Sequence, residues 1–378
     1  MENKVTLAKD INNHISTHAS NVWPDFNPLP FILYDDKSQI AVGKLWPSRY
    51  AEVEEGIWTA EGPDLLLMGN TSIMYHGRRV AIWDTRTWPS DIDTAQATSY
   101  VAHEMFHAFQ HSSMSLMWAN ELLLPQYPHN ERSVALVIEE NRWLAKILTN
   151  PDAISTGNIL NYMASLRNRR ESEIDPDFIE YDKHCESVEG SAAYVEICMK
   201  AAIDRVSPLE TAISYLPYLT INDNLLNNYR HRLYATGLLL CLASDIMWPG
   251  WQAEWAKSGK TIFDWMTNRL NPKKSHVAIN TADLIEASDL LTTHQQIKEE
   301  KINKFMAQPL DIIKGNIQLI SFDPMNLVCA SGNCLHLHGR VKINDREQVL
   351  TMPFLAEYGD TILDIKRIFI PKTASIGR

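Results

Sequence analysis

The string H-E-M-F-H at residues 103–107 constrains this chain more than any other feature of its 378 residues. His103 and His107 are four residues apart, so on a helix they lie on one face, one turn apart. Two imidazoles in that arrangement can share one tetrahedral zinc ion. Glu104 is offset by one residue, which turns its carboxylate towards the attacking water rather than towards the metal. The string therefore predicts a zinc site in which Glu104 acts as the general base.

The residues around this string favour a helix. The segment 94–112 contains no proline or glycine, and apolar side chains recur beside the histidines. Asp91 and Asp93 precede it, at positions where a helix takes its N-cap and its first acidic residues. This context disfavours the alternative interpretation, a helix that carries two histidines by chance.

A catalytic zinc ion needs a third protein ligand and an open position for water. In the extended motif H-E-x-x-H-x-x-G-x-x-H, a glycine would stand at 110 and a histidine at 113, but this chain has Gln110 and Ser113. His111 lies eight residues after His103, about 12 Å along a helix axis, so three histidines cannot converge on one ion. We expect His111 to lie at the surface or to contact a ligand residue without binding the metal itself.

The third ligand is therefore expected to be a glutamate from a later helix. The candidates are Glu121, Glu139, Glu140, Glu186, Glu189 and Glu196. Glu189 is favoured because the small residues 190–193 follow it, and small residues let helices approach closely enough for a metal bond of about 2 Å. Glu186, one turn earlier, is expected either to hydrogen-bond a ligand histidine or to be the ligand itself. The alternative is that the small residues only pack and that these acids are solvated.

Two strings carry a resemblance to a known family. HEMFHAFQ at 103–110, followed by ESVEGSAAYVE at 186–196, resembles the glutamate-zincin type of zinc metallopeptidase. That family carries H-E-x-x-H on one helix and a ligand glutamate on a later one. The resemblance implies His103, His107 and Glu189 as ligands of Zn²⁺, Glu104 as the catalytic base and a zincin-like catalytic domain. It covers these strings and the helical stretch between them, and it identifies no subfamily.

Hydrolysis of a carbonyl compound also forms an oxyanion, which such enzymes stabilise with a tyrosine, histidine or arginine donor. Tyr194 lies five residues after Glu189, about 140° around a helix, and is expected to face away from the metal. The string YRHRLY at 229–234 begins a long apolar helix. Tyr234 and His231 share one face of that helix and are the expected donors. The alternative is a helix start whose polar side chains merely reach solvent.

Composition narrows the class of protein. The chain is 45% hydrophobic and 21% charged, as is ordinary for a globular protein. Its net charge of −11 disfavours nucleic acid and anionic membranes as partners. Residues 1–14 contain no apolar core of signal-peptide length, and the chain has no stretch of 18 apolar residues that would span a membrane. We therefore expect a cytoplasmic protein, and its oligomeric state is not specified. The cysteines are expected to be reduced thiols: Cys185, Cys198, Cys241, Cys329 and Cys334.

The distribution of patterns along the chain predicts an α+β protein. Residues 1–92 are expected to form a short helix and a small, mostly antiparallel sheet, with strands at 31–34, 39–42, 65–68, 71–75 and 80–83. An edge strand of this sheet beside the metal would be able to pair with an extended peptide.

Residues 93–305 are expected to be almost wholly helical. The expected helices lie near 94–112, 130–149, 153–171, 177–203, 208–216, 223–246, 261–270 and 281–304. Gly237, inside one of them, suggests a close contact with another backbone. The charged segment 298–304 marks the boundary to a small C-terminal β unit at 306–378.

In the C-terminal β unit, strand-like runs lie at 317–320, 334–343, 348–354 and 362–370. The string VCASGNCLHLHGRV at 328–341 predicts a hairpin that turns at 331–333. Alternation would place one polar face on the second strand, made of His336, His338, Arg340 and Lys342. This interpretation is favoured over a second metal site that would include Cys329 and Cys334.

Together these features predict a zinc-dependent peptidase that acts on a peptide or protein substrate. One alternative is a non-catalytic zinc-binding or interaction protein. Glu104 argues against it, because a structural zinc site needs no carboxylate beside its first ligand. Another alternative is a metallohydrolase of a non-peptide amide or ester, which the sequence does not distinguish from a peptidase.

Overall fold

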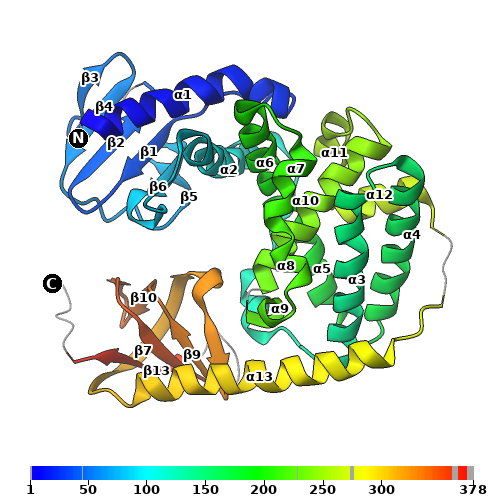
Figure 1. The fold of residues 1–378 in the computed structure, drawn as a ribbon. Helices are drawn as coiled ribbons and strands as arrows, with labels where there is room; N and C mark the ends of the chain where they lie inside the picture. Colours follow the sequence, from blue (N-terminus) through cyan, green and yellow to red (C-terminus); the bar gives the residue numbers. More distant parts are fainter. Residues whose placement is uncertain (1, 45, 228, 273–275, 360–364, 373–378) are drawn as a thin grey trace.

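The computed structural model describes residues 2–44, 46–227, 229–272, 276–359 and 365–372. The predicted fold class is confirmed: the protein is α+β, with an N-terminal sheet, a helical middle part and a C-terminal sheet (Figure 1). Among the described residues, no helix is long and apolar enough to cross a membrane.

The N-terminal part combines one long helix with a mixed sheet. Its elements are α1 (Glu2–Val22), β1 (Phe31–Tyr34), β2 (Ser38–Val42), β3 (Ala51–Glu54), β4 (Ile57–Glu61), β5 (Thr71–Tyr75), β6 (Arg78–Asp84) and the 3-10 turn η1 (Thr85–Thr87). The strand order is β3-β4-β2-β1-β6-β5, so β5 lies at an edge. The parallel pair is β1 and β6, and the other neighbours are antiparallel, as the sequence predicts. Helices α1 and α2 (Thr94–Ser113) cover one face (Figure 1).

The prediction of a strand at 65–68 is wrong. Asp64 holds this segment in a turn, because its side chain accepts from the Leu66 amide at 3.0 Å and its carbonyl accepts from the Leu67 amide at 3.0 Å. The strands β3 and β4 were not predicted. β3 is exposed along its whole length and therefore lacks the apolar alternation that marks a half-buried strand.

The middle part is helical, as predicted. Its helices are α2, α3 (Glu131–Thr149), α4 (Ala153–Arg170), α5 (Pro176–Cys185), α6 (Ser191–Asp204), α7 (Pro208–Thr211), α8 (Pro217–Thr220), α9 (Asp223–Asn227), α10 (Tyr229–Met247), α11 (Gln252–Ser258), α12 (Ile262–Leu270) and α13 (Thr281–Met306). The 3-10 turns η2 (Glu121–Gln126) and η4 (Ala212–Tyr215) connect some of them. The long helix expected at 223–246 coincides with α9 and α10, and residue 228 between them lies outside the described residues.

The helix predicted at 177–203 contains a π-helical turn, η3 (Glu186–Gly190), between α5 and α6. This turn packs against α10 at two glycines. A Cβ on Gly190 would lie 2.3 Å from the Gly237 Cα, and a Cβ on Gly237 would lie 2.3 Å from the Glu186 carbonyl oxygen. The close contact expected at Gly237 is therefore confirmed. The sequence favoured Glu189 because small residues after it would let two helices approach each other at the metal. The structure shows that Gly190 instead lets the π-helical turn approach α10.

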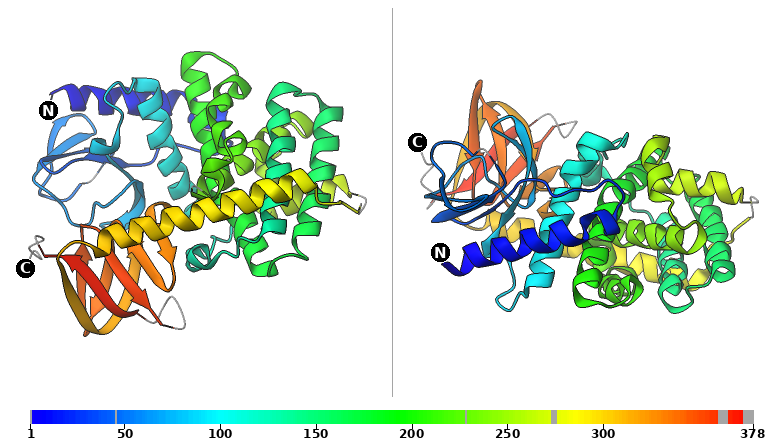
Figure 2. Two further views of the ribbon diagram at one scale, coloured as in Figure 1. Left: turned by 60° about the horizontal axis from the view of Figure 1, so that its bottom comes forward. Right: turned by 90° about the horizontal axis from the view of Figure 1, so that it is seen from above.

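The C-terminal part is a sheet joined to the helical part by α13. Its elements are β7 (Leu310–Phe322), η5 (Pro324–Asn326), β8 (Val328–Ala330), β9 (Asn333–His336), β10 (Gly339–Ile343), β11 (Arg346–Leu350), β12 (Phe354–Tyr358) and β13 (Ile365–Pro371). The order is β11-β10-β7-β13-β12-β9-β8. The start of the strand predicted at 362–370 lies outside the described residues. Figure 2 shows α13 running from the helices to this sheet, where Ile302 and Phe305 pack against it.

The predicted hairpin is confirmed as β8 and β9, with Val328 opposite Leu335. Two expectations about it are wrong. Cys329 and Cys334 form a disulfide instead of two reduced thiols, so the expected cytoplasmic location loses that support. Strand β9 also ends at His336 and β10 begins at Gly339, which interrupts the alternation of the proposed polar face. His336 lies on the same face of β9 as the buried Cys334 and is itself buried, with its ring stacked on Phe354 at 4.6 Å.

Replacing Gly237 with alanine should lower the free energy of unfolding by about 1–3 kcal/mol, because the added methyl overlaps the Glu186 carbonyl. Urea unfolding would measure the loss. Gly157→Ala in α4 is the matched control. Its Cβ would lie 3.5 Å from the Met247 side chain, and alanine is favoured over glycine in a helix by about 1 kcal/mol. Equal urea midpoints for Gly237→Ala and the wild type would contradict the close packing of η3 and α10.

Candidate metal centre

Helix α2 presents both histidines of the H-E-x-x-H string on one buried face. The Asp93 side chain caps this helix by accepting from the Gln96 amide at 2.7 Å, as the sequence predicts. The His103 and His107 rings lie 4.9 Å apart, and both side chains are buried. Helix α2 packs against α6, and both histidines lie close to Glu189 in the π-helical turn η3, which directly precedes α6.

Glu189 completes a group of three ligand atoms. One donor atom each from His103, His107 and Glu189 lies within 4.8 Å of the others. Glu189 Oε2 lies 3.1 Å from His107 Nε2 and 3.6 Å from His103 Nε2. Two tetrahedral ligands, each about 2.0–2.1 Å from zinc, are about 3.3 Å apart. These spacings therefore suit a tetrahedral metal ion.

The second nitrogen of each histidine is held by a side chain outside the group. Glu196 Oε2 lies 3.0 Å from His103 Nδ1, and Gln110 Oε1 lies 2.8 Å from His107 Nδ1. Gln110 is fixed in turn, because its amide nitrogen donates to the Val188 carbonyl at 2.8 Å. Acceptors at Nδ1 place the ring protons there and leave the Nε2 lone pairs for a metal.

Glu189 divides its two carboxylate oxygens between a cation and the histidines. Oε1 accepts from the Arg230 guanidinium at 2.7 Å. Oε2 is buried and, within the described residues, has no hydrogen bond of regular geometry. Burial acts to raise the pKa of Glu189, but the charges of Arg230 and His107 hold it well below its usual value. An ionised oxygen without a donor, directed at two Nε2 atoms, is what a metal ligand requires.

Electrostatics at His103 also favour a cation in this position. Burial acts to lower the pKa of His103, yet the nearby carboxylates of Glu189 and Glu196 raise it to about 10. The carboxylates therefore stabilise a positive charge between them. A divalent metal supplies that charge when His103 is neutral and acts as a ligand.

Glu186, the alternative to Glu189, lies outside the group. It is fully buried and accepts from Arg167 at 2.5 and 2.7 Å and from the Thr236 hydroxyl at 2.6 Å. It bonds no ligand histidine, so neither of its two expected roles matches its position. The remaining candidates are also engaged elsewhere: Glu121 with Arg230, Glu139 with Tyr162, and Glu140 with Arg167 and Arg232.

Glu104 lies beside the group, directly after His103, and its side chain is buried. Burial raises the pKa of Glu104 above its usual value, and positive charge on His103 or His107 opposes that rise. A carboxylate with a raised pKa accepts a proton more readily at neutral pH, as a general base must.

The two expected oxyanion donors occupy different places. The Tyr234 ring stacks on His103 at 5.8 Å, and its hydroxyl accepts from Arg230 at 2.6 Å. His231 lies farther out, stacked on Tyr218 at 5.1 Å, with its ring 6.0 Å from that of Tyr234. Tyr234 therefore adjoins the metal group, whereas His231 lies behind it.

Two further expectations about neighbours of the site are confirmed. Tyr194 faces away from the metal group, with its hydroxyl bonded to Asp245 at 2.9 Å. His111 is exposed and stacks on Trp118 at 4.0 Å.

Sequence reasoning missed the role of Arg230, although it noted the string that contains this residue. It treated Gln110 only as a departure from a longer motif, and Glu196 only as one more ligand candidate. The available signal was position: Gln110 is three residues after His107, and Glu196 is seven after Glu189, two turns along the same helix face.

Comparison of the chain with protein-family models, with curated proteins and with solved structures gives no match. The candidate metal centre is therefore interpreted from its own geometry and chemistry.

Removing Glu189 should abolish stoichiometric zinc binding, because it takes away a ligand and leaves only the two histidines. In contrast, Glu186→Gln should retain zinc, since Glu186 binds Arg167 and Thr236 rather than the metal group. Zinc content after dialysis, measured by atomic emission, would compare Glu189→Ala with Glu186→Gln. Zinc loss in Glu186→Gln with retention in Glu189→Ala would show that the ligand has been misassigned.

Proposed function

We propose that the protein is a zinc-dependent hydrolase that cleaves peptide bonds. The observation that carries this proposal is the convergence of His103, His107 and Glu189, with spacings that suit tetrahedral zinc, directly beside the buried carboxylate of Glu104. A carboxylate in that position has a use in hydrolysis and none in a purely structural zinc site.

His103 and His107 would hold the zinc ion through Nε2, and Glu189 would hold it through Oε2. When bound, zinc polarises a substrate carbonyl and lowers the pKa of water. The described residues supply three donors, which leaves one position of a tetrahedral ion open. Catalytic sites keep such a position, whereas structural sites fill all four. This favours an enzyme over a non-catalytic zinc protein.

Glu104 would take a proton from the water that attacks the peptide carbonyl. It would then deliver that proton to the nitrogen of the leaving amine. Its burial supports both steps, because the raised pKa of this carboxyl favours proton uptake and keeps the proton available for transfer.

Tyr234 would donate a hydrogen bond to the developing oxyanion. Its oxygen accepts from Arg230, so its own proton has to be donated to a second acceptor, which is Glu189 in this structure and would be the oxyanion during hydrolysis. Arg230 thereby positions Tyr234 and Glu189 together, because one guanidinium contacts both side chains. His231 stacks on Tyr218, and its ring lies 6.0 Å from that of Tyr234, so it would instead support the ring of Tyr234.

A peptide is the favoured substrate because of the sheet beside the site. Strand β5 lies at the edge of the N-terminal sheet and packs against α2, the helix of the metal ligands. An extended peptide can add to such an edge through main-chain hydrogen bonds. A compact amide or ester would make no use of this edge.

Glu104→Gln should keep bound zinc but lose hydrolysis by about 10²–10⁴-fold or more, because the general base is removed. The measurement compares both proteins, loaded with zinc, on a panel of peptides by mass spectrometry. Full activity in Glu104→Gln would refute the mechanism. Hydrolysis of simple esters or amides but of no peptide, again dependent on Glu104, would point to a metallohydrolase of another substrate class.

Tyr234→Phe should bind zinc normally and lower kcat by about 10²–10³-fold with little change in KM, since one oxyanion donor is lost. His231→Gln and Tyr194→Phe should have much milder effects, because neither side chain contacts the metal group. Steady-state kinetics at saturating substrate would separate them. A large kcat loss confined to Tyr194→Phe or His231→Gln would move the donor role to that residue.

A further inference from the structure

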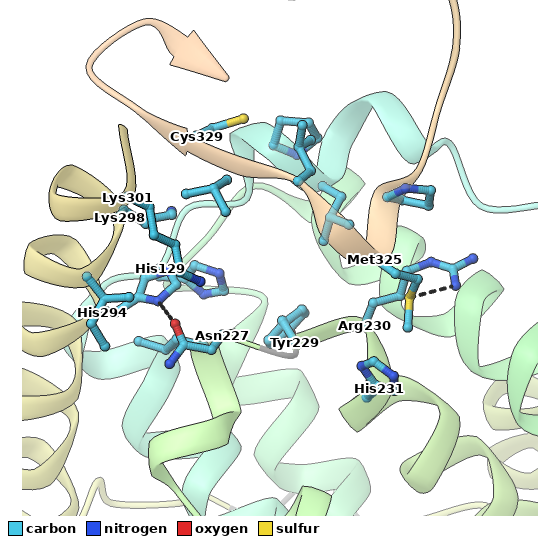
Figure 3. Close-up of a pocket in the computed structure, with 17 residues that line it drawn as sticks. His129, Asn227, Tyr229, Arg230, His231, His294, Lys298, Lys301, Met325 and Cys329 are labelled. Carbon is cyan, nitrogen blue, oxygen red and sulfur yellow. Dashed lines mark hydrogen bonds between the residues drawn. The ribbon is translucent and has the colours of Figure 1, made fainter. Parts of the chain in front are cut away.

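A pocket adjoins the metal group on the side of the C-terminal sheet. It lies between the start of α10, helix α13 and the segment that runs from η5 into β8 (Figure 3). Part of its wall is apolar, formed by Leu124, Pro125, Leu226, Ile297, Pro324, Leu327 and Val328. The C-terminal β unit thus contributes directly to a cavity of the helical part.

The polar wall of this pocket is basic. It contains His129, Arg230, His231, His294, Lys298 and Lys301. None of the described residues that line the pocket is an aspartate or a glutamate. The chain as a whole has 46 acidic residues against 35 lysines and arginines, whereas the pocket is lined by Arg230, Lys298 and Lys301 and by no acidic residue among those described.

Two of these basic groups lack a counter-charge. Arg230 is neutralised by Glu121 and Glu189. Lys298 and Lys301 have no carboxylate within 4.0 Å in the described part of the chain. Burial lowers the pKa of the half-buried Lys298. Burial, followed by the charges of Lys298 and Lys301, lowers the pKa of His294 to about 4. Lys298 is half-buried and Lys301 is exposed at the rim, so an anion in the pocket would pair with two lysines that have no carboxylate partner among the described residues.

The pocket is connected to the metal group through α10. Arg230 lines the pocket and also donates to Glu189, and His231, one turn before Tyr234, lines it as well. Figure 3 shows Arg230 and His231 across the pocket from Lys298 and Lys301. Met325 lines the pocket next to Arg230, with its sulfur 3.4 Å from the Arg230 guanidinium. A substrate at the metal would therefore lie next to this pocket.

We propose that this pocket is a substrate subsite that binds a carboxylate of the peptide, with Lys298 and Lys301 as its cationic groups. The inference rests on the proposed peptidase function. The apolar wall would pack against the residue that carries the carboxylate, and the two lysines would pair with the carboxylate itself. Both the terminal α-carboxylate and an acidic side chain supply this chemistry.

Calorimetry on zinc-loaded Glu104→Gln protein tests this without requiring hydrolysis. The probes are acetyl-tetraalanine with a free carboxylate, the same peptide as its C-terminal amide, and that amide with glutamate as its last residue. At least one of the two anionic peptides should bind about tenfold or more tightly than the neutral amide, as hydrogen bonds to charged groups allow. Tight binding of the first identifies the α-carboxylate, and tight binding of the third alone identifies a side chain.

The added substitutions Lys298→Gln and Lys301→Gln should remove this preference, while binding of the neutral amide stays unchanged. Lys304→Gln is the matched control, because it removes the same charge from the same helix but lies outside the pocket. The Lys304→Gln variant should prefer the anionic peptide as strongly as the Glu104→Gln protein to which the substitution is added.

Equal affinity for all three peptides, or no binding of any, would overturn the proposal. So would a preference that survives the two lysine substitutions. Acetate and inorganic phosphate are titrated as well: if they bind at one site that the lysine substitutions remove, while the peptides show no preference, the pocket binds a free anion instead. Binding is measured without hydrolysis, and peptidase activity is assayed separately on the wild-type protein. Failure of the carboxylate subsite can therefore be distinguished from failure of the proposed peptidase function.

Discussion

The contact between the backbones of Gly190 and Gly237 is the constraint on which the candidate metal centre depends. It lets α10 cross the π-helical turn at a separation that excludes even a methyl group. Arg230 and Tyr234 consequently reach from α10 to Glu189 and to the ring of His103. A shift by the size of one methyl group would exceed the tolerance of these hydrogen bonds, which is a few tenths of an ångström.

A second principle that organises this region is the pairing of buried charges. Glu140 and Glu186 are fully buried and are neutralised by Arg167 and Arg232. An unpaired charge at these positions would cost several kcal/mol, so these carboxylates are committed to the fold. Glu189 differs because its arginine takes only one oxygen and leaves the other directed at the histidines. The positions of the arginines therefore decide which glutamate keeps an oxygen available for a metal ion.

The sequence was sufficient for features that are encoded locally. The helix of His103, its cap at Asp93 and the α+β class follow from spacing and periodicity. Glu189 was favoured because small residues follow it, although Gly190 turned out to face α10. The arrangement of Arg230 with Glu189 was not predictable, because it depends on a contact between segments 41 residues apart. The break between β9 and β10 was hidden as well, since His336 and His338 continue an apparent alternation across it.

Helix α13 gives the C-terminal β unit a mechanical relation to the rest of the protein. Its first half is anchored on α3 by Arg142 with Asp283, and its last turn is packed into the C-terminal sheet. Its 26 residues make a rod of about 39 Å. By simple leverage, a tilt of about 5° at the anchored end displaces the far end by about 3 Å over that length. A small tilt of α13 at the Arg142–Asp283 contact would therefore move the C-terminal sheet and, with it, the wall of the pocket that contains Met325.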